Sequence, residues 1–194
     1  MYSILMTVLV ALAPSNMELA EDALIMSLED IPGRIGEYGI ESVAIEIEGE
    51  HAGSWFIKQT VSSMLHENGY TVTGRTEEGP VITLRIRPME LVVEYGDVSR
   101  PWVVGNKRVD RIATVELSTT LLDTQGEILM TMRSSGTARD EIAWSDTEIL
   151  NGSAEWEWLT GDLPENRGGG ILEPIIVSGV VASLVYLFYS SRAD

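Results

Sequence analysis

The stretch Ala113-Thr-Val-Glu-Leu-Ser-Thr-Thr-Leu-Leu-Asp-Thr-Gln-Gly-Glu-Ile-Leu-Met-Thr-Met132 decides the fold. Mostly apolar residues occupy every second position of its first half, and the same period returns in its last five residues. A period of two is typical of β-strands that bury one face. Between the two runs lies Asp123-Thr-Gln-Gly126, whose glycine suits a turn position with positive φ. The stretch therefore predicts a β-hairpin.

Another strand is expected before this hairpin. Apolar and polar residues alternate from Ile82 to Tyr95, with an interruption at Pro88. Proline has no N–H to donate to a neighbouring strand, so Pro88 predicts a bulge or a sheet edge. Residues 96–106 are expected to form the loop that leads into the hairpin.

Residues 42–73 predict a strand–helix–strand unit. Residues 42–48 alternate in the manner of a half-buried strand, and residues 52–68 carry an apolar face at helical spacing. Gly69 follows the helix at a position where glycine commonly ends helices, and residues 70–73 form a second short strand. Such a unit predicts two parallel strands joined by a right-handed crossover.

Helices are expected on both sides of these strands. Ser15-Asn-Met-Glu18 has the form of a capping box, and apolar residues then recur at spacings of three and four as far as Ile31. Pro32-Gly33 is expected to end this helix, with a loop over residues 35–39. After the hairpin, residues 145–150 predict a short helix.

Together these elements predict an α+β fold. We expect a two-layer sandwich over residues 42–150, with helices on one face of a mixed, mostly antiparallel sheet. Residues 15–41 supply an amphipathic helix and a loop before it. Residues 151–170 contain tryptophans and glycines and are expected to form a tether, whose tryptophans dock on the domain or lie at a membrane interface.

An apolar segment lies at each end of the chain. Residues 171–190 predict a transmembrane helix, because the 19 residues 171–189 would span about 28 Å. The short tail 191–194 follows. Residues 1–14 resemble a signal peptide, although no basic residue precedes the apolar run and Pro14 directly follows Ala13. A buried helix is the alternative at either end, and removal of the C-terminal segment as a processing signal is another.

Composition limits the functions that are possible. The 194 residues suffice for one domain with terminal segments, and the net charge of −17 argues against nucleic-acid binding. The chain has no cysteine, which excludes disulfides, thiolate metal sites, cysteine nucleophiles and a lipidated N-terminal cysteine. No motif for a cofactor is present, and none is expected.

Few residues suggest chemistry. The two histidines lie 15 residues apart, too far to act as same-face zinc ligands on one helix. Three acidic pairs could each supply one carboxylate of a hydrolase: Glu77-Glu78, Asp140-Glu141, and Asp146 with Glu148. The basic cluster is a possible partner-binding site for an anionic component or an acidic protein face: Arg100, Trp102, Lys107, Arg108 and Arg111. Alternatively, these cations pair within the chain, with Glu90, Glu94 and Glu116.

The order of elements over residues 42–135 resembles the α/β domain of bacterial envelope assembly lipoproteins of the lipopolysaccharide-assembly and curli-pore types. The stretches that carry the resemblance are Leu65-His-Glu-Asn-Gly-Tyr-Thr-Val72, Val81-Ile-Thr-Leu-Arg-Ile86 and Val115-Glu-Leu-Ser-Thr-Thr-Leu-Leu-Asp-Thr-Gln-Gly-Glu-Ile-Leu129. The chain departs from these families because it lacks the lipidated cysteine and has an apolar C-terminal segment. The resemblance implies a binding or assembly role without catalysis.

The expected protein is therefore a membrane-anchored component of the bacterial cell envelope with a binding, scaffolding or assembly role. We expect it in the inner membrane with the domain in the periplasm, or otherwise in another envelope membrane. Its partner would be an envelope protein or an anionic envelope component, bound at a strand edge near Pro88 or at the loop from Arg100 to Arg111. An envelope glycan hydrolase that uses a carboxylate pair is the alternative.

Overall fold

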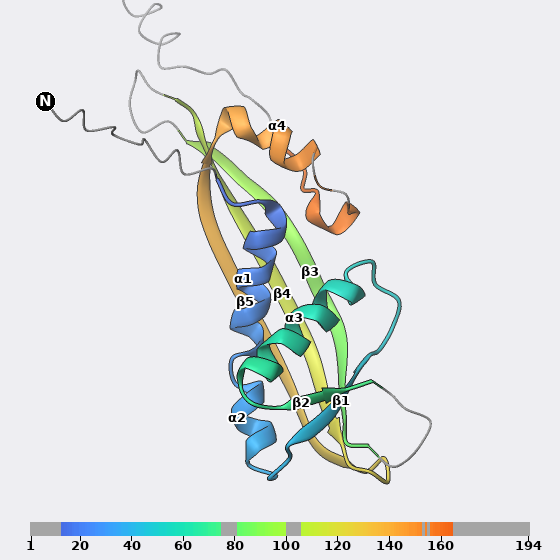
Figure 1. Cartoon of the computed structure of the whole chain (residues 1–194). Coiled ribbons are helices and arrows are strands. Elements are labelled where there is room, and N and C mark those ends of the chain that lie inside the picture. Colours follow the sequence, from blue (N-terminus) through green and yellow to red (C-terminus); the bar gives the residue numbers. More distant parts are fainter. Residues whose placement is uncertain (1–12, 75–80, 100–105, 153, 155, 165–194) are drawn as a thin grey trace, which may run out of the picture.

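The structure is a computed structural model that describes residues 13–74, 81–99, 106–152, 154 and 156–164. Five strands form one sheet in the order β2-β1-β3-β4-β5, and helices lie along one face of it (Figure 1). The strand β1 runs parallel to both of its neighbours, whereas β3, β4 and β5 are antiparallel. The predicted α+β fold with a mixed, mostly antiparallel sheet is confirmed for these residues.

The predicted hairpin is present as β4 (Arg108–Leu122) and β5 (Ile128–Ala143). Gly126 has the positive φ expected of it, 86°. The Asp123 carboxylate accepts hydrogen bonds of 2.8 Å from the backbone N–H groups of Gln125 and Glu127. The local hydrogen bonds of an aspartate at the start of the turn thus fix where the two strands reverse.

The strand β3 (Thr83–Ser99) has both features predicted at Pro88. Its register with β4 shifts between Pro88 and Glu90, which marks a bulge. It pairs with β1 only over Thr83–Ile86, so beyond Pro88 that edge of β3 has no strand partner among the described residues. The predicted loop over residues 96–106 is too long, because a second register shift between Tyr95 and Val98 keeps residues 96–99 within the strand.

The strand–helix–strand unit is also confirmed. It consists of β1 (Ser42–Ile47), α3 (Ser54–Glu67) and β2 (Thr71–Thr73), and the two strands are parallel. Gly69 follows α3 with a φ of 87°, a conformation that residues other than glycine rarely adopt. The helix buries one face: Phe56, Ile57, Thr60, Val61 and Leu65.

The N-terminal helix is divided into two. α1 (Asn16–Leu28) begins with the predicted capping box, and α2 (Ile31–Gly36) follows with Pro32 in its first turn. The predicted loop over residues 35–39 is therefore wrong at its start, because proline begins a second helix here rather than only ending the first. α1 packs on β4 and β5 and is part of the same hydrophobic core as the sheet.

The chain after β5 folds back onto the domain. α4 (Trp144–Gly152) is followed by the short 3-10 helix η1 (Glu157–Leu159), whose Trp158 and Leu159 are buried in the main core. Docking of tryptophan, one of the two predictions for this segment, is thus confirmed for Trp158. The predicted transmembrane helix over residues 171–190 and residues 1–12 of the signal-like segment lie outside the described residues. Within the described ranges, no helix is long and apolar enough to cross a bilayer.

Candidate functional site

Arg111 lies in the interior of the protein, at the end of the sheet where α1 begins. Residues on β4 alternate between the two faces of the sheet, and Arg111 occupies the buried row between Val109 and Ala113. Its side chain is fully buried. The register places Tyr95 of β3 on one side of it and Asp140 of β5 on the other.

Every nitrogen of the guanidinium group has an acceptor. Nε and Nη2 donate to the two carboxylate oxygens of Asp140, over 2.9 and 2.5 Å. Nη1 donates to Oδ1 of Asn16 over 2.7 Å, and Nη2 also donates to the carbonyl of Pro14 over 2.8 Å. The paired donors match the planar fork of a carboxylate, and the four hydrogen bonds compensate for removing the charge from water.

Asn16 connects this arginine to the last described part of the chain. Its Nδ2 donates to the carbonyl of Leu159 over 2.7 Å, and the hydroxyl of Tyr95 lies within 3.1 Å of its amide group. We call the connected residues the Arg111 cluster: Pro14, Asn16, Tyr95, Arg111, Asp140 and Leu159. The Arg111 cluster joins the start of α1, three strands and η1, and the side chains of Asn16, Tyr95 and Arg111 within it are buried.

A small apolar cluster lies beside these polar groups. Tyr95, Val109 and Ile142 are its buried centre, and residues from both ends of the described chain pack on it: Ala13, Val98, Trp144, Leu150 and Leu163. We call this the chain-end cluster. Both ends of the folded unit therefore leave the sheet at the same place.

The capping box of α1 lies next to the Arg111 cluster. The backbone N–H of Ser15 donates to Oε2 of Glu18 over 2.6 Å, and the Ser15 hydroxyl accepts from the backbone N–H of Glu18 over 3.1 Å. The hydrogen bond from the Ser15 backbone lowers the pKa of the Glu18 carboxyl below its ordinary value, helped by the Ser15 side chain and by the charge of Arg111. Glu18 is thus held in its charged form.

The structure separates the residues of the predicted basic cluster. Arg108 and Arg111 belong to β4 rather than to a loop. They are three residues apart, and side chains alternate along a strand, so the two arginines lie on opposite faces of the sheet. Arg108 is half exposed and pairs with Glu141 over 2.8 Å. The carbonyl of Lys107 accepts the N–H of Trp144, while Arg100 and Trp102 lie outside the described residues.

The alternative of pairing within the chain is confirmed for Arg108 and Arg111, but the predicted acidic partners are wrong. Both arginines pair with acids of β5, since that strand lies directly opposite them. Of the three predicted glutamates, Glu116 pairs instead with Arg133 over 2.8 Å. The buried position of Arg111 removes it from any contact surface and makes it a residue of the interior.

Two of the three predicted acidic pairs lie in the described ranges, and neither brings its two carboxylates together. Asp140 and Glu141 are consecutive on β5, so they point to opposite faces of the sheet, and each binds an arginine. Asp146 accepts a hydrogen bond from Ser145 on α4. Glu77 and Glu78 lie outside the described residues. No group of three His, Asp or Glu side chains in the described part of the chain could hold a metal ion.

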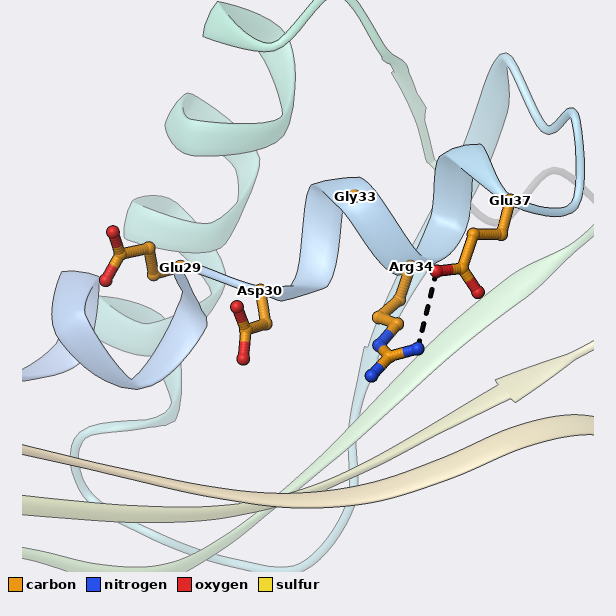
Figure 2. A pocket seen from close by; sticks show the side chains of 5 residues that line it. All are labelled: Glu29, Asp30, Gly33, Arg34 and Glu37. Atoms are coloured by element: carbon orange, nitrogen blue, oxygen red, sulfur yellow. Dashed lines mark hydrogen bonds and ion pairs between the residues drawn. The ribbon is translucent and has the colours of Figure 1, made fainter.

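A shallow depression of about 400 Å³ lies over the junction of α1 and α2 (Figure 2). It is lined by Glu29, Asp30, Gly33, Arg34 and Glu37. Arg34 pairs with Glu37 over 3.3 Å, and both side chains are well exposed. Figure 2 shows the carboxylates of Glu29 and Asp30 apart from that pair, so the depression holds no converging set of groups.

Aromatic residues hold the segment after α4. The ring of Trp158 lies 5.3 Å from that of Phe56 and 6.4 Å from that of His51, and Trp156 lies 5.6 Å from Trp55.

Sequence reasoning missed the partners of Arg111, namely Asn16, Tyr95 and Asp140. The sequence did contain a signal that Arg111 is buried. Arg111 continues the row of every second residue that contains Ala113 and Val115, which were expected to face the core.

No protein-family model matches the chain, and no curated protein matches it either. Three solved structures illustrate its structural neighbours. The minor lipoprotein of Acinetobacter baumannii has 16% identity and a TM-score of 0.38, over 58% of this chain and 76% of its own. Rare lipoprotein B of Shewanella oneidensis has 12% identity and a TM-score of 0.34, over 78% of this chain and 96% of its own. An uncharacterized lipoprotein B of Nitrosomonas europaea has 15% identity and a TM-score of 0.29, over 57% of this chain and 72% of its own.

These neighbours are bacterial lipoproteins at low identity, the class of protein that the sequence resembles.

Proposed function

We propose that this chain is a membrane-anchored protein of the bacterial cell envelope, whose α+β domain binds or organises a partner without catalysis. The observation that carries this proposal is that Ala13 and Leu163 pack on the same chain-end cluster. Each lies next to the sequence that leads to one of the two apolar segments. A domain held in this way has one region of attachment to a membrane.

The Arg111 cluster fits this role. One guanidinium group binds the carbonyl of Pro14, and through Asn16 it is connected to the carbonyl of Leu159. The entry and the exit of the domain are therefore fixed to the same three strands. Replacing a whole buried ion pair by apolar residues often changes stability little, so the role we propose for Arg111 and Asp140 is to specify one arrangement of the segments that they join.

For location, we propose the inner membrane with the domain in the periplasm. The resemblance to envelope assembly proteins and the signal-like residues 1–14 support export. Arg192, the basic residue of the C-terminal tail, would then remain in the cytoplasm, as the distribution of positive charge in membrane proteins favours.

For partner binding, we propose two surfaces. The edge of β3 next to Pro88 has no strand partner among the described residues and Met89 there is 49% exposed, whereas Gly161 lies against the Val93 carbonyl further along the strand. Such an edge accepts an extended segment of another protein. Arg108 and the stretch that contains Arg100, Trp102 and Lys107 supply positive charge for an envelope protein or an anionic envelope component.

Membrane fractionation tests the anchor. The full chain should resist carbonate extraction, whereas a chain that ends at residue 164 and keeps Trp158 should be extracted as a folded domain once the N-terminal segment is also removed. Val181→Asp, which places a charge in the middle of the apolar run, should weaken membrane retention, and Ser191→Asp in the tail is the matched control. Carbonate-resistant retention of the chain that lacks both segments would contradict the proposal.

Charge reversal tests the contact surface. Crosslinking from native membranes should recover a partner with the wild-type chain and less of it with Arg108→Glu. Arg87→Glu, an exposed arginine on β3, provides the control for charge alone. Equal recovery of the partner with both variants would show that Arg108 is not part of the contact surface.

A further inference from the structure

The strand β5 ends the sheet, and its outer edge has no strand partner in the part of the chain that the structure describes. β5 is 16 residues long. Long edge strands present unpaired N–H and C=O groups that pair readily with another strand. An edge of this length is normally paired with another strand or covered by other parts of a protein.

The residues that present these groups can be identified. The N–H of Trp144 donates to the carbonyl of Lys107 of the neighbouring strand. The backbone N–H and C=O groups of even-numbered residues of β5 therefore point toward β4, and those of odd-numbered residues point toward the outer edge. The Tyr38 hydroxyl donates to the carbonyl of Leu129 over 2.9 Å, which agrees with this parity and covers the lower end of the edge. The free edge thus runs from Thr131 to Ala143, and its midpoint is Thr137.

The charges on β5 are complementary about the same midpoint. In an antiparallel pair of two β5 strands centred on Thr137, Arg133 of each copy lies opposite Glu141 of the other. A pair centred on Gly136 would instead place Arg133 opposite Arg139, and like charges in facing positions destabilise a sheet. Charge and free edge therefore select one register.

Apolar residues also face each other in this register. On the helix-covered face, Met132 would lie opposite Ile142 of the second copy, a residue that the chain-end cluster of its own chain already buries. Met26 of α1, the helix that packs on β5, is 53% exposed.

From these observations we infer that β5 pairs antiparallel with β5 of a second copy of this chain, around Thr137, so that the two sheets become continuous. The exposed intrachain pairs Arg133–Glu116 and Glu141–Arg108 lie on the same uncovered face. Pairing of two copies would join them into one row of alternating charges. The chain-end clusters would then lie on opposite sides of the two-fold axis, so, given the membrane anchors of the proposed function, the strands would run along a shared membrane rather than away from it.

Crosslinking in membranes is a direct test, because the full chain contains no cysteine. Thr137→Cys places one thiol on each side of the two-fold axis, and mild oxidation or a short bifunctional maleimide should yield a covalent dimer. Thr131→Cys is the matched control on the same face, since two such residues would lie about 40 Å apart along the paired strands. Equal crosslinking at both positions, or an adduct of Thr137→Cys that contains another protein, would overturn the proposal.

Charge complementation tests the register independently of crosslinking. Full chains with Arg133→Glu or with Glu141→Arg should each dimerise roughly tenfold more weakly than the wild type, because two facing pairs become repulsive. Mixing the two variants should restore association, since each new charge then faces its opposite on the other copy. Mixing does not change the fold of either variant chain, so restored association can come only from contacts between the two copies. Mixtures that associate no better than the single variants would exclude the Thr137-centred register.

Discussion

The guanidinium group of Arg111 donates to Oδ1 of Asn16 over 2.7 Å, so a residue in the middle of the chain fixes the first residue of α1. This contact spans 95 positions of sequence and lies in the interior. A contact of this kind cannot be formed until the sheet and the helix are both in place, so it reports on the complete fold rather than on any single element.

Removing the buried charge should destabilise the domain. Arg111→Met leaves the Asp140 carboxylate and the Pro14 carbonyl without the donors of Arg111, and we expect a loss of about 3 kcal/mol in the free energy of unfolding. This value is at the low end for buried pairs because the Asp140 side chain is 21% exposed. Urea denaturation followed by circular dichroism measures it.

Two controls sharpen that test. Arg133→Met breaks the exposed pair with Glu116 and should cost less than about 1 kcal/mol. The double variant Arg111→Met/Asp140→Leu removes both charges and should recover part of the lost stability. Equal losses for Arg111→Met and Arg133→Met would show that the Arg111 cluster is not a structural centre.

The close approach of α1 to β5 requires glycine at position 136. A Cβ atom at Gly136 would lie 1.9 Å from the Ala23 carbonyl oxygen and 2.7 Å from the Ser27 nitrogen, both of which belong to the helix backbone. Gly136→Ala should therefore push α1 away from the sheet and cost about 1–3 kcal/mol. Thermal unfolding should show the loss, whereas Gly33→Ala in α2, where nothing lies within 4 Å, should be neutral or slightly stabilising.

Trp158 should control whether the segment after α4 stays on the domain. Its side chain is 9% exposed and packs on Phe56, so Trp158→Ala removes a large buried contact and should cost about 3 kcal/mol. Hydrogen exchange should then rise in α4 and η1 more than in β4. Trp55→Ala, at a position that is 41% exposed, is the comparison, and unchanged exchange in Trp158→Ala would contradict the docking role.

The capping box should make stability depend on pH. Folding lowers the pKa of Glu18, so its contribution is present above the pKa of the unfolded chain and is lost as pH falls through the lower pKa of the folded state. We expect Glu18→Gln to be less stable than the wild type at neutral pH and the difference to shrink below about pH 4. A difference that stays constant down to pH 2 would indicate that the carboxylate charge has no part in it.

Local patterns predicted most of the fold because each element carries its own signal. The hairpin followed from alternation and from Gly126, α3 from its apolar face and Gly69, and the bulge from Pro88. The start of α2 was missed because Pro32 can both end one helix and begin another, and the choice depends on burying Ile31 and Ile35 in the core. That burial is a property of the tertiary structure.

The candidate site was harder to predict, for a physical reason. Arg100, Trp102, Lys107, Arg108 and Arg111 form a group only along the sequence, whereas alternation on β4 sends Arg108 to the outer face and Arg111 to the core. Arg111 selects Asp140 because the hairpin register places them opposite each other. Asn16 binds this guanidinium group and also the carbonyl of Leu159, which lies 143 residues further along the chain, and no local pattern encodes that meeting.

The neighbouring positions of Ala13 and Leu163 have a consequence for how this unit can be moved between proteins. A folded unit whose two ends lie together can be inserted between any two adjacent residues of a host without separating the parts of the host that flank it. For the same reason, its sequence can be permuted: a short linker from residue 164 to residue 13, with new ends in the turn at Thr124-Gln125, leaves every strand pairing in place. In this protein the unit is flanked in sequence by the two apolar segments, so a permuted chain would carry neither of them at its new ends.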